Sequence, residues 1–250
     1  MKKIEKHIEK YWDQNSRYYQ EESKIKIGIH YGPGSPFEDK LNLLGNLKGK
    51  KVIELGCGGA QCGIAMAKKG AIVTGIDQSK EQLNFAKQLA DKNKVKIKLI
   101  HGSFQDLRKV KSNSYDLVFS AFAFLYSPDL LKLFKQINRI LKKKGSFVFS
   151  LDHPLFNIVD PKKFKVQRSY FKTGKQMEKM RSGPSLVTYN HTLSELFNPL
   201  VEAGFMVEKI IEPDSRIKYK NDPWYGLWDY YTPKRMQVVP PTIIFKARKK

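Results

Sequence analysis

A glycine-rich turn with acidic residues around it is the part of the sequence best suited to bind a ligand. The turn follows a short apolar stretch and reads VIELGCGGAQCG, residues 52–63. Gly56, Gly58 and Gly59 let the backbone turn sharply and let a ligand approach without obstruction by Cβ atoms. Asp77, 21 positions after Gly56, can accept hydrogen bonds from both hydroxyls of a ribose. The spacing predicts a ligand that contains a nucleoside.

The residues beside the turn narrow the choice of ligand. A dinucleotide fingerprint needs a third glycine for close helix packing, and Gln61 occupies that position. Glu54 lies just before the first glycine, where its charge would repel a pyrophosphate but suits an ammonium and a sulfonium. A tight strand–helix turn without a ligand is the alternative, and Asp77 at this distance argues against it. The preferred ligand is S-adenosylmethionine.

These residues need strands that end at a common edge, and the sequence alternates in the required way. Strands are predicted at 50–55, 71–77, 95–100, 115–122, 146–151, 205–211 and 242–248. Helices are predicted at 60–69, 79–91, 128–141 and 192–203. Such alternation indicates βαβ units and a parallel sheet with helices on both faces. Residues 153–188 and 213–236 break the pattern, and long loops of this kind are usually functional or mobile.

The order and spacing of four motifs resemble a known enzyme class. ELGCGGAQCG, GIDQS, YDLVFSAFAFLY and LKKKGSFVFSLDHP are similar to the class I S-adenosylmethionine-dependent methyltransferases, most of all to the broad UbiE-type group. The resemblance covers roughly residues 12–249. WDQNSRYYQ, HYGPGSP, SLDHP, RSYF and EAGF resemble a subgroup that acts on small molecules. Methyl transfer to a small-molecule acceptor is therefore the expected activity.

The expected fold is α/β: a doubly wound, mostly parallel, seven-stranded Rossmann-like sheet with helices on both faces and an antiparallel last strand. An N-terminal helical arm and inserted loops are expected over the site. We expect one methyltransferase domain over residues 1–250. It divides into an arm or lid (1–48), a cofactor-binding half (49–152) and a substrate-side half (153–250).

The resemblance also implies which residues hold the cofactor. Glu54, Gly56, Cys57, Gly58 and Gly59 would line its methionine and ribose portion, with Asp77 on the ribose hydroxyls and Gln78 beside the adenine. Ser103 stands where the class often has an acidic residue facing the adenine amino group, and Phe104 would lie against the ring. The other residues expected at the cofactor are Tyr19, Tyr31, Gln82, Gln105, Ser120, Ala121 and Phe122.

A sulfonium methyl is already electrophilic, so the protein must mainly align the acceptor and exclude water. A hydroxyl or ammonium acceptor would also need a base. His153, in the SLDHP turn, is the candidate base, and a structural role in the turn is equally compatible with its position. Asp152 is expected to orient or cap rather than to act as the base. No metal site is expected.

Aromatic residues are the candidates for the acceptor pocket. His30 and Tyr126 are expected near the acceptor, together with His153. A loop near residue 224 is dense in aromatics and would form a substrate wall or plug the sheet edge; its candidates are Trp224, Tyr225 and Trp228. Trp12 and Tyr19 lie seven residues apart on the N-terminal helix and are expected to pack on the sheet domain.

Charge sets the remaining expectations. The chain carries 46 Lys and Arg against 24 Asp and Glu, a formal charge of +22. Such a surplus attracts polyanions, so an RNA acceptor is the first alternative; the scattered lysines favour the small-molecule reading. A non-catalytic protein that binds adenine nucleotide or NAD is the second alternative.

No apolar run approaches the roughly 20 residues of a membrane span, so a cytoplasmic protein without a membrane partner is expected. The oligomeric state is not predicted.

Overall fold

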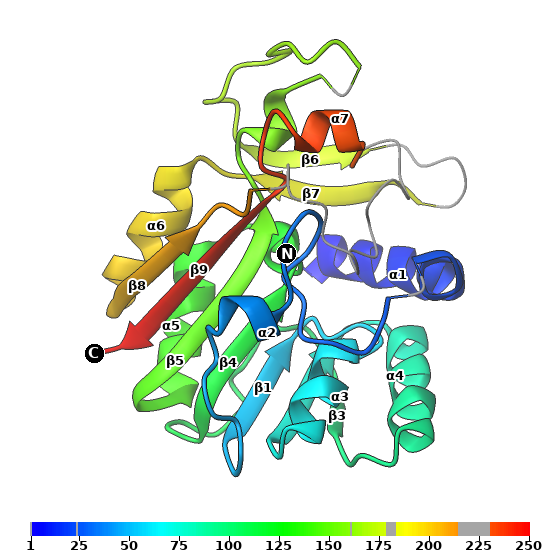
Figure 1. Cartoon of the computed structure of the whole chain (residues 1–250), viewed down its shortest axis with the longest axis vertical. Coiled ribbons are helices and arrows are strands. Elements are labelled where there is room, and N and C mark those ends of the chain that lie inside the picture. The colour runs from blue at the N-terminus through cyan, green and yellow to red at the C-terminus, as the bar shows by residue number, and fades with distance from the viewer. Residues whose placement is uncertain (1, 24, 161, 179–183, 215–230) are drawn as a thin grey trace.

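Seven strands form one sheet in the order β3-β2-β1-β4-β5-β9-β8 (Figure 1). The computed structural model describes residues 2–23, 25–160, 162–178, 184–214 and 231–250. The strands of the sheet are β1 (Lys51–Leu55), β2 (Ile72–Asp77), β3 (Lys98–His101), β4 (Tyr115–Ala121), β5 (Leu141–Asp152), β8 (Phe205–Ile211) and β9 (Thr242–Lys249). β1 to β5 pair in parallel, and β9 runs antiparallel between β5 and β8. The predicted sheet, including its antiparallel last strand, is confirmed.

Apolar side chains on both faces place β1 and β4 in the middle of the sheet. Four of the five residues of β1 are buried, and so is the central run of β4. On one face, Phe134 and Leu200 pack against Phe147, Phe149 and Phe245 in the largest apolar cluster. The other face is covered by residues of the N-terminal arm and by one helix that follows the glycine turn. A sheet covered in this way exposes its strand ends, and these ends carry the polar residues of the site.

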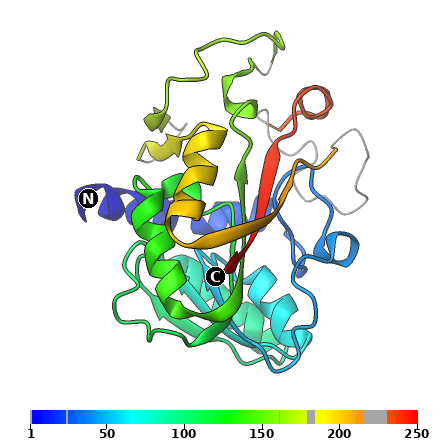
Figure 2. The ribbon, with the colours of Figure 1, turned by 90° about the vertical axis from the view of Figure 1, so that its left-hand side faces the viewer.

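The helices lie on both faces and at one edge of the sheet (Figures 1 and 2). They are α1 (Lys2–Ser23), α2 (Glu38–Leu41), α3 (Gln61–Lys68), α4 (Lys80–Lys92), α5 (Leu130–Ile140), α6 (Leu193–Glu202) and α7 (Pro233–Met236). Short 3₁₀ turns occur at η1 (Phe124–Tyr126) and η2 (Phe156–Ile158). α6 begins with a capping box in which Thr192 and Glu195 satisfy each other's backbone N–H groups.

One expectation about secondary structure is wrong. Residues 153–188 were expected to be irregular, but β6 (Gly174–Glu178) and β7 (Leu186–Asn190) form an antiparallel two-stranded sheet there. Val187 is buried, and β7 contacts α1 and η1, so the hairpin gains its stability from tertiary packing that no local pattern reveals. Among the described residues, no helix is long and apolar enough to cross a membrane.

Candidate functional site

The carboxyl ends of four parallel strands gather the candidate residues at one edge of the sheet. β1, β2, β4 and β5 end there at Leu55, Asp77, Ala121 and Asp152. α1 lies across this edge and contacts α4 and β7 (Figure 1). The edge of a parallel sheet is where ligands bind in folds of this kind.

The glycine turn is held by hydrogen bonds to the neighbouring strand. The backbone N–H groups of Gly56 and Cys57 both donate to the carbonyl of Ile76, at 2.9 and 3.0 Å. Gly56 has a φ of 69°, and a Cβ there would lie 2.3 Å from the Cβ of Ala123. Glycine is therefore required at position 56 both for its conformation and for the close approach of the turn after β4.

Asp77 connects the glycine turn to the start of α4. One carboxylate oxygen accepts a hydrogen bond from Gly58 N–H at 2.8 Å, and the other accepts from Ser79 N–H at 2.9 Å. Burial raises the pKa of Asp77, and these backbone hydrogen bonds oppose the increase. A carboxylate has about four acceptor positions, so two remain for the hydroxyls of a ligand.

Glu54 is a buried carboxyl at the end of β1 with an unsatisfied atom. Its side chain is 4% exposed, and its Oε2 has no hydrogen-bond partner. A Cβ at Gly63 would lie 2.6 Å from this oxygen, so glycine makes room for it. Burial raises the pKa of Glu54 to about 8; a backbone hydrogen bond from Gly63 opposes the increase, and the charge of Asp77 adds to it. An unsatisfied buried carboxyl beside a ligand turn is suited to receive a cationic group.

The shifted pKa of Glu54 predicts how stability depends on pH. The folded state holds the proton between the ordinary value of 4.5 and about 8, whereas the unfolded chain releases it. Stability from this group is therefore lost as pH rises through that window. In Glu54→Gln the ligand-free protein should melt about 10 °C above the wild type at pH 8, since this pKa change corresponds to roughly 5 kcal/mol and each kcal/mol shifts Tm by about 2–4 °C, and it should show little difference near pH 5. Thermal denaturation at both pH values measures this, with exposed Glu81→Gln as control; an equal change at both values would contradict it.

Three glutamine amides connect α1 to the glycine turn. Gln61 donates to Gln20 at 2.6 Å, and Gln20 donates to Gln82 at 2.7 Å. All three side chains are buried. A Cβ at Gly59 would lie 2.8 Å from Gln20 Nε2, so the amides pack directly on the turn. The sequence predicted Gln82 at the glycine turn. It did not predict Gln20 there, nor the hydrogen bond between Gln20 and Gln61.

A second contact fixes α1 to the first turn of α4. The Ser79 hydroxyl caps α4 by accepting from Gln82 N–H at 3.1 Å, and it donates to Asp13 of α1 at 2.7 Å. Asp13 also accepts from the N–H of Glu81 at 3.3 Å. α1 is thereby placed as a cover over the cofactor edge.

The residues expected at the adenine lie together after β3. Phe104 is buried, and its ring lies 3.7 Å from the position that a Cβ at Gly56 would occupy. The Ser103 hydroxyl accepts from Gln105 N–H at 3.2 Å. Gln105 Nε2 donates to the carbonyl of Tyr126 at 3.3 Å, and Gln78 is half-buried nearby, its carbonyl 2.9 Å from a ring nitrogen of His101.

The end of β4 contains one strained residue. Ser120 is buried and donates to the carbonyl of Leu55 at 2.8 Å, so it joins β4 to β1. Ala121 is half-buried. Phe122 has a φ of 55°, which is uncommon for a bulky residue. Its ring lies 1.9 Å from where a Cβ at Gly32 would stand, so the HYGPGSP segment needs its glycine for this contact.

The structure does not bring Tyr31 to the cofactor edge. Tyr31 is fully buried against Phe119, and its hydroxyl donates to Glu38 at 2.5 Å. Its contacts are those of a core residue that holds the arm on the sheet, and the expected cofactor contact stays a prediction. His30 has its carbonyl beside the Cys62 thiol at the start of α3, and burial lowers the pKa of its ring to about 4.

An aromatic cluster joins α1 to the 3₁₀ turn η1. Trp12 of α1 makes edge-to-face contacts with Tyr11, Tyr19 and Tyr126, with ring centroids 5.4, 5.2 and 6.1 Å apart. Burial raises the pKa of Tyr126 well above its ordinary value, with smaller contributions from Tyr11 and Tyr19 and an opposing hydrogen bond from Trp12. The N-terminal aromatics therefore pack, as expected, but they pack on a substrate candidate.

Asp152 is the carboxyl that faces this cluster. Tyr231 donates a hydrogen bond to its Oδ1 at 2.7 Å. Burial raises the pKa of Asp152 to about 6, and the Tyr231 hydrogen bond opposes the increase. Its charge also acts on Tyr126. A small cavity of about 10 Å³ beside Asp152 is bounded by Tyr189 and His191.

Both ring nitrogens of His153 are hydrogen-bonded, and neither bond is to the cluster that Asp152 faces. Leu155 N–H donates to its Nδ1 at 3.1 Å, so Nδ1 carries the lone pair. Nε2 then carries the proton and donates it to Glu212 at 2.6 Å. His153 is 4% exposed, and burial lowers its pKa. Its lone pair is occupied by the backbone, an arrangement that favours the structural role over the expected base.

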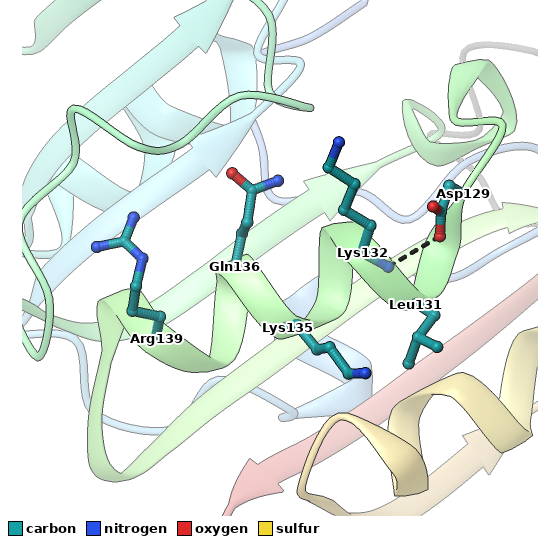
Figure 3. Close-up of a pocket in the computed structure, with 6 residues that line it drawn as sticks. All are labelled: Asp129, Leu131, Lys132, Lys135, Gln136 and Arg139. Atoms are coloured by element: carbon teal, nitrogen blue, oxygen red, sulfur yellow. Dashed lines mark hydrogen bonds between the residues drawn. The ribbon is translucent and has the colours of Figure 1, made fainter.

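A larger groove lies away from this site. It has a volume of about 420 Å³ along the outer face of α5, and Figure 3 shows Lys132, Lys135 and Arg139 spread along the helix. Arg139 is held by the carbonyls of Leu107 and Val110, so it is a structural residue. Gln136 of this groove donates a hydrogen bond to the carbonyl of Gln105 at 2.8 Å, so the groove lies behind the segment that follows β3. Trp224, Tyr225 and Trp228 lie outside the described residues.

Comparison with known proteins identifies the family of the chain. The model of the methyltransferase domain family matches residues 46–201, more than half of the chain. The chain belongs to the S-adenosylmethionine-dependent methyltransferases. The enzyme is 29% identical to an uncharacterized protein of Haemophilus influenzae over 224 residues, 84% of this chain and 85% of that protein.

Two further similarities concern activity and fold. The ubiquinone biosynthesis O-methyltransferase of Vibrio vulnificus is 32% identical over 143 residues, which span 57% of this enzyme and 60% of the relative. The solved structure of an S-adenosylmethionine-dependent methyltransferase from Mesorhizobium loti superposes with a TM-score of 0.66 at 22% identity, covering 84% of this chain and 95% of that one. The second similarity shows the same fold.

The residues present fit the cofactor of the family. S-adenosylmethionine carries two positive groups and a ribose. The unsatisfied Glu54 oxygen and the remaining acceptor positions of Asp77 match the ammonium and the ribose hydroxyls in hydrogen-bonding type. Gly56, Gly58 and Gly59 add no Cβ atoms to the turn between them.

Proposed function

We propose that this methyltransferase acts on a small-molecule acceptor with an ionisable nucleophile, and that Asp152 takes the proton from that nucleophile. The observation that carries the proposal is the Asp152 carboxyl, held by Tyr231 at the end of β5 with a pKa of about 6. A base with a pKa near the working pH is effective in proton transfer.

Different residues would bind the different groups of the cofactor. When bound, S-adenosylmethionine supplies an electrophilic methyl group. Glu54 would hold the cationic methionine end and Asp77 the ribose hydroxyls. Phe104, Gln78 and Gln105 would surround the adenine. Gln20 and Gln61 would close the turn from the side of α1 and exclude water.

The acceptor side favours a molecule with an aromatic or apolar body. Tyr11 and Tyr126 both contact Trp12, the charge of Asp152 acts on Tyr126, and α1 contacts β7. His7 of α1 reaches the carbonyl of Ser185, just before β7, at 2.7 Å. A site roofed on two sides suits an acceptor small enough to be enclosed. His30 would lie at the methionine end of that space.

The relatives support an oxygen acceptor. The Vibrio relative is named for O-methylation in ubiquinone biosynthesis, and a phenolic hydroxyl is an acceptor that Asp152 could deprotonate as the methyl group is transferred. RNA is the competing acceptor class, because the chain carries a formal charge of +22.

An acceptor screen tests the proposal. The purified enzyme is incubated with S-adenosylmethionine and phenols, thiols, amines or bulk RNA, and S-adenosylhomocysteine formation is measured. We expect turnover with at least one phenol, with activity rising through about pH 6 as Asp152 ionises. Turnover with RNA alone would overturn the small-molecule assignment. A flat pH profile would overturn the role of Asp152.

A further inference from the structure

The segment 162–172, here called the crest, projects from one end of the molecule between η2 and β6 (Figures 1 and 2). Three large apolar side chains are exposed on it. Phe171 is 82% exposed, Val166 68% and Phe164 37%. Single exposed apolar residues are ordinary, but three within eight positions of one projecting segment are not explained by packing.

Basic residues are interleaved with these apolar side chains. Lysines stand at 162, 163, 165 and 172, with Arg168 between them and no acidic residue in the crest. The four lysines are exposed. The crest therefore combines apolar side chains with positive charge on the same short stretch.

Hydrogen bonds hold the crest in two defined turns. Asp160 accepts from the N–H groups of Lys162 and Lys163 at 2.8 and 2.6 Å, and its own N–H donates to Lys165 at 2.8 Å. Phe164 sits at the tip of this turn with a φ of 54°. In the second turn, Lys172 N–H donates to the carbonyl of Ser169 at 3.2 Å. Each turn presents an aromatic ring flanked by lysine.

We propose that the crest docks on the surface of membranes that contain anionic lipids. Exposed aromatic and aliphatic side chains insert at the boundary between headgroups and acyl chains, and lysines beside them attract anionic headgroups. Charge complementarity selects this partner, because the crest is basic throughout. Docking of this kind needs no spanning helix. It revises the expectation of no membrane partner, which rested only on the missing span.

Flotation with vesicles tests the proposal. Vesicles of phosphatidylcholine are compared with an equimolar mixture of phosphatidylcholine and phosphatidylglycerol. We expect the wild type to float with the anionic vesicles at low salt and to stay behind with the neutral ones. Phe171→Ser combined with Val166→Ser should lower the bound fraction by about 10-fold or more. Lys162→Gln combined with Lys163→Gln and Lys165→Gln should lower it at low salt, and the difference from the wild type should shrink as salt screens the charges.

The matched control changes the same residue types at the other end of the sheet. Ile72, 59% exposed at the start of β2, becomes serine, and exposed Lys69 becomes glutamine; binding should stay at the wild-type level. Thermal denaturation should be unchanged in the crest variants, because their side chains are exposed. The proposal would be overturned if the wild type did not float with anionic vesicles, or if the serine variants floated as the wild type does. It would also be overturned if the wild type bound a labelled RNA instead of the anionic vesicles. Vesicle binding is independent of methyl transfer, so failure here leaves the proposed activity standing.

Discussion

Asp77→Asn should weaken the binding of S-adenosylhomocysteine by about 100-fold. The carboxylate holds the glycine turn and the start of α4 through Gly58 and Ser79 while offering its other lone pairs to the ribose. An amide has one acceptor oxygen, so it cannot keep both backbone contacts and also receive two hydroxyls. Hydrogen bonds to a charged group contribute roughly 1.5–3 kcal/mol each, and about 2.7 kcal/mol corresponds to 100-fold in affinity.

Isothermal titration with S-adenosylhomocysteine measures this loss without turnover. Asp91→Asn, an exposed aspartate on α4, serves as the control and should bind like the wild type. The folded state of Asp77→Asn is checked by circular dichroism, because two backbone contacts are altered. Binding of the variant within threefold of the wild type would contradict the assigned role of Asp77.

Asp152→Asn should lower kcat by roughly 10²–10⁴-fold and leave the affinity for S-adenosylhomocysteine unchanged. The amide keeps the shape of the side chain and its contact with Tyr231, but it cannot accept a proton. In the wild type, kcat should rise with pH through about 6, where Asp152 loses its proton.

Tyr231→Phe provides the more selective test of the same carboxyl. Tyr231 donates to Asp152 and so lowers its pKa. Removing the hydroxyl should move the rising limb of the pH profile to higher pH while high-pH activity is largely retained. A control, Asp39→Asn on α2, should change neither kcat nor the profile. An Asp152→Asn variant with more than a tenth of wild-type kcat would show that the proton leaves by another route.

Local sequence was sufficient to predict the sheet and the glycine turn. Each strand from β1 to β5 carries its own apolar run, and Gly56 and Asp77 are tied to strand ends by spacing alone. The β6–β7 hairpin escaped prediction because Gly174–Glu178 is mostly polar and lies at an edge, where burial does not impose alternation.

The parts of the site that depend on tertiary docking could not be predicted. Gln20 meets Gln61 and Gln82 across 41 and 62 residues of chain, and nothing near Gln20 indicates those partners. The sequence does not indicate that the side chains of Asp152 and His153 have different surroundings, which only the structure shows. Neighbouring residues at a strand end point to opposite sides, and the sequence does not say which side faces the acceptor.

The docking of α1 affects the order in which the elements of the enzyme fold and the element that opens most easily. α1 precedes its partners on α4 and β7 in the chain, and the contact of His7 with Ser185 spans 178 residues. Contacts of such separation form late in folding, and we expect α1, which lies outside the sheet, to detach while the sheet stays folded. Amide hydrogens of α1 would then exchange with solvent before those of β1 and β4. Such an opening would uncover Gln20, Gln61 and Gln82 beside the glycine turn, and we expect cofactor exchange to depend on it.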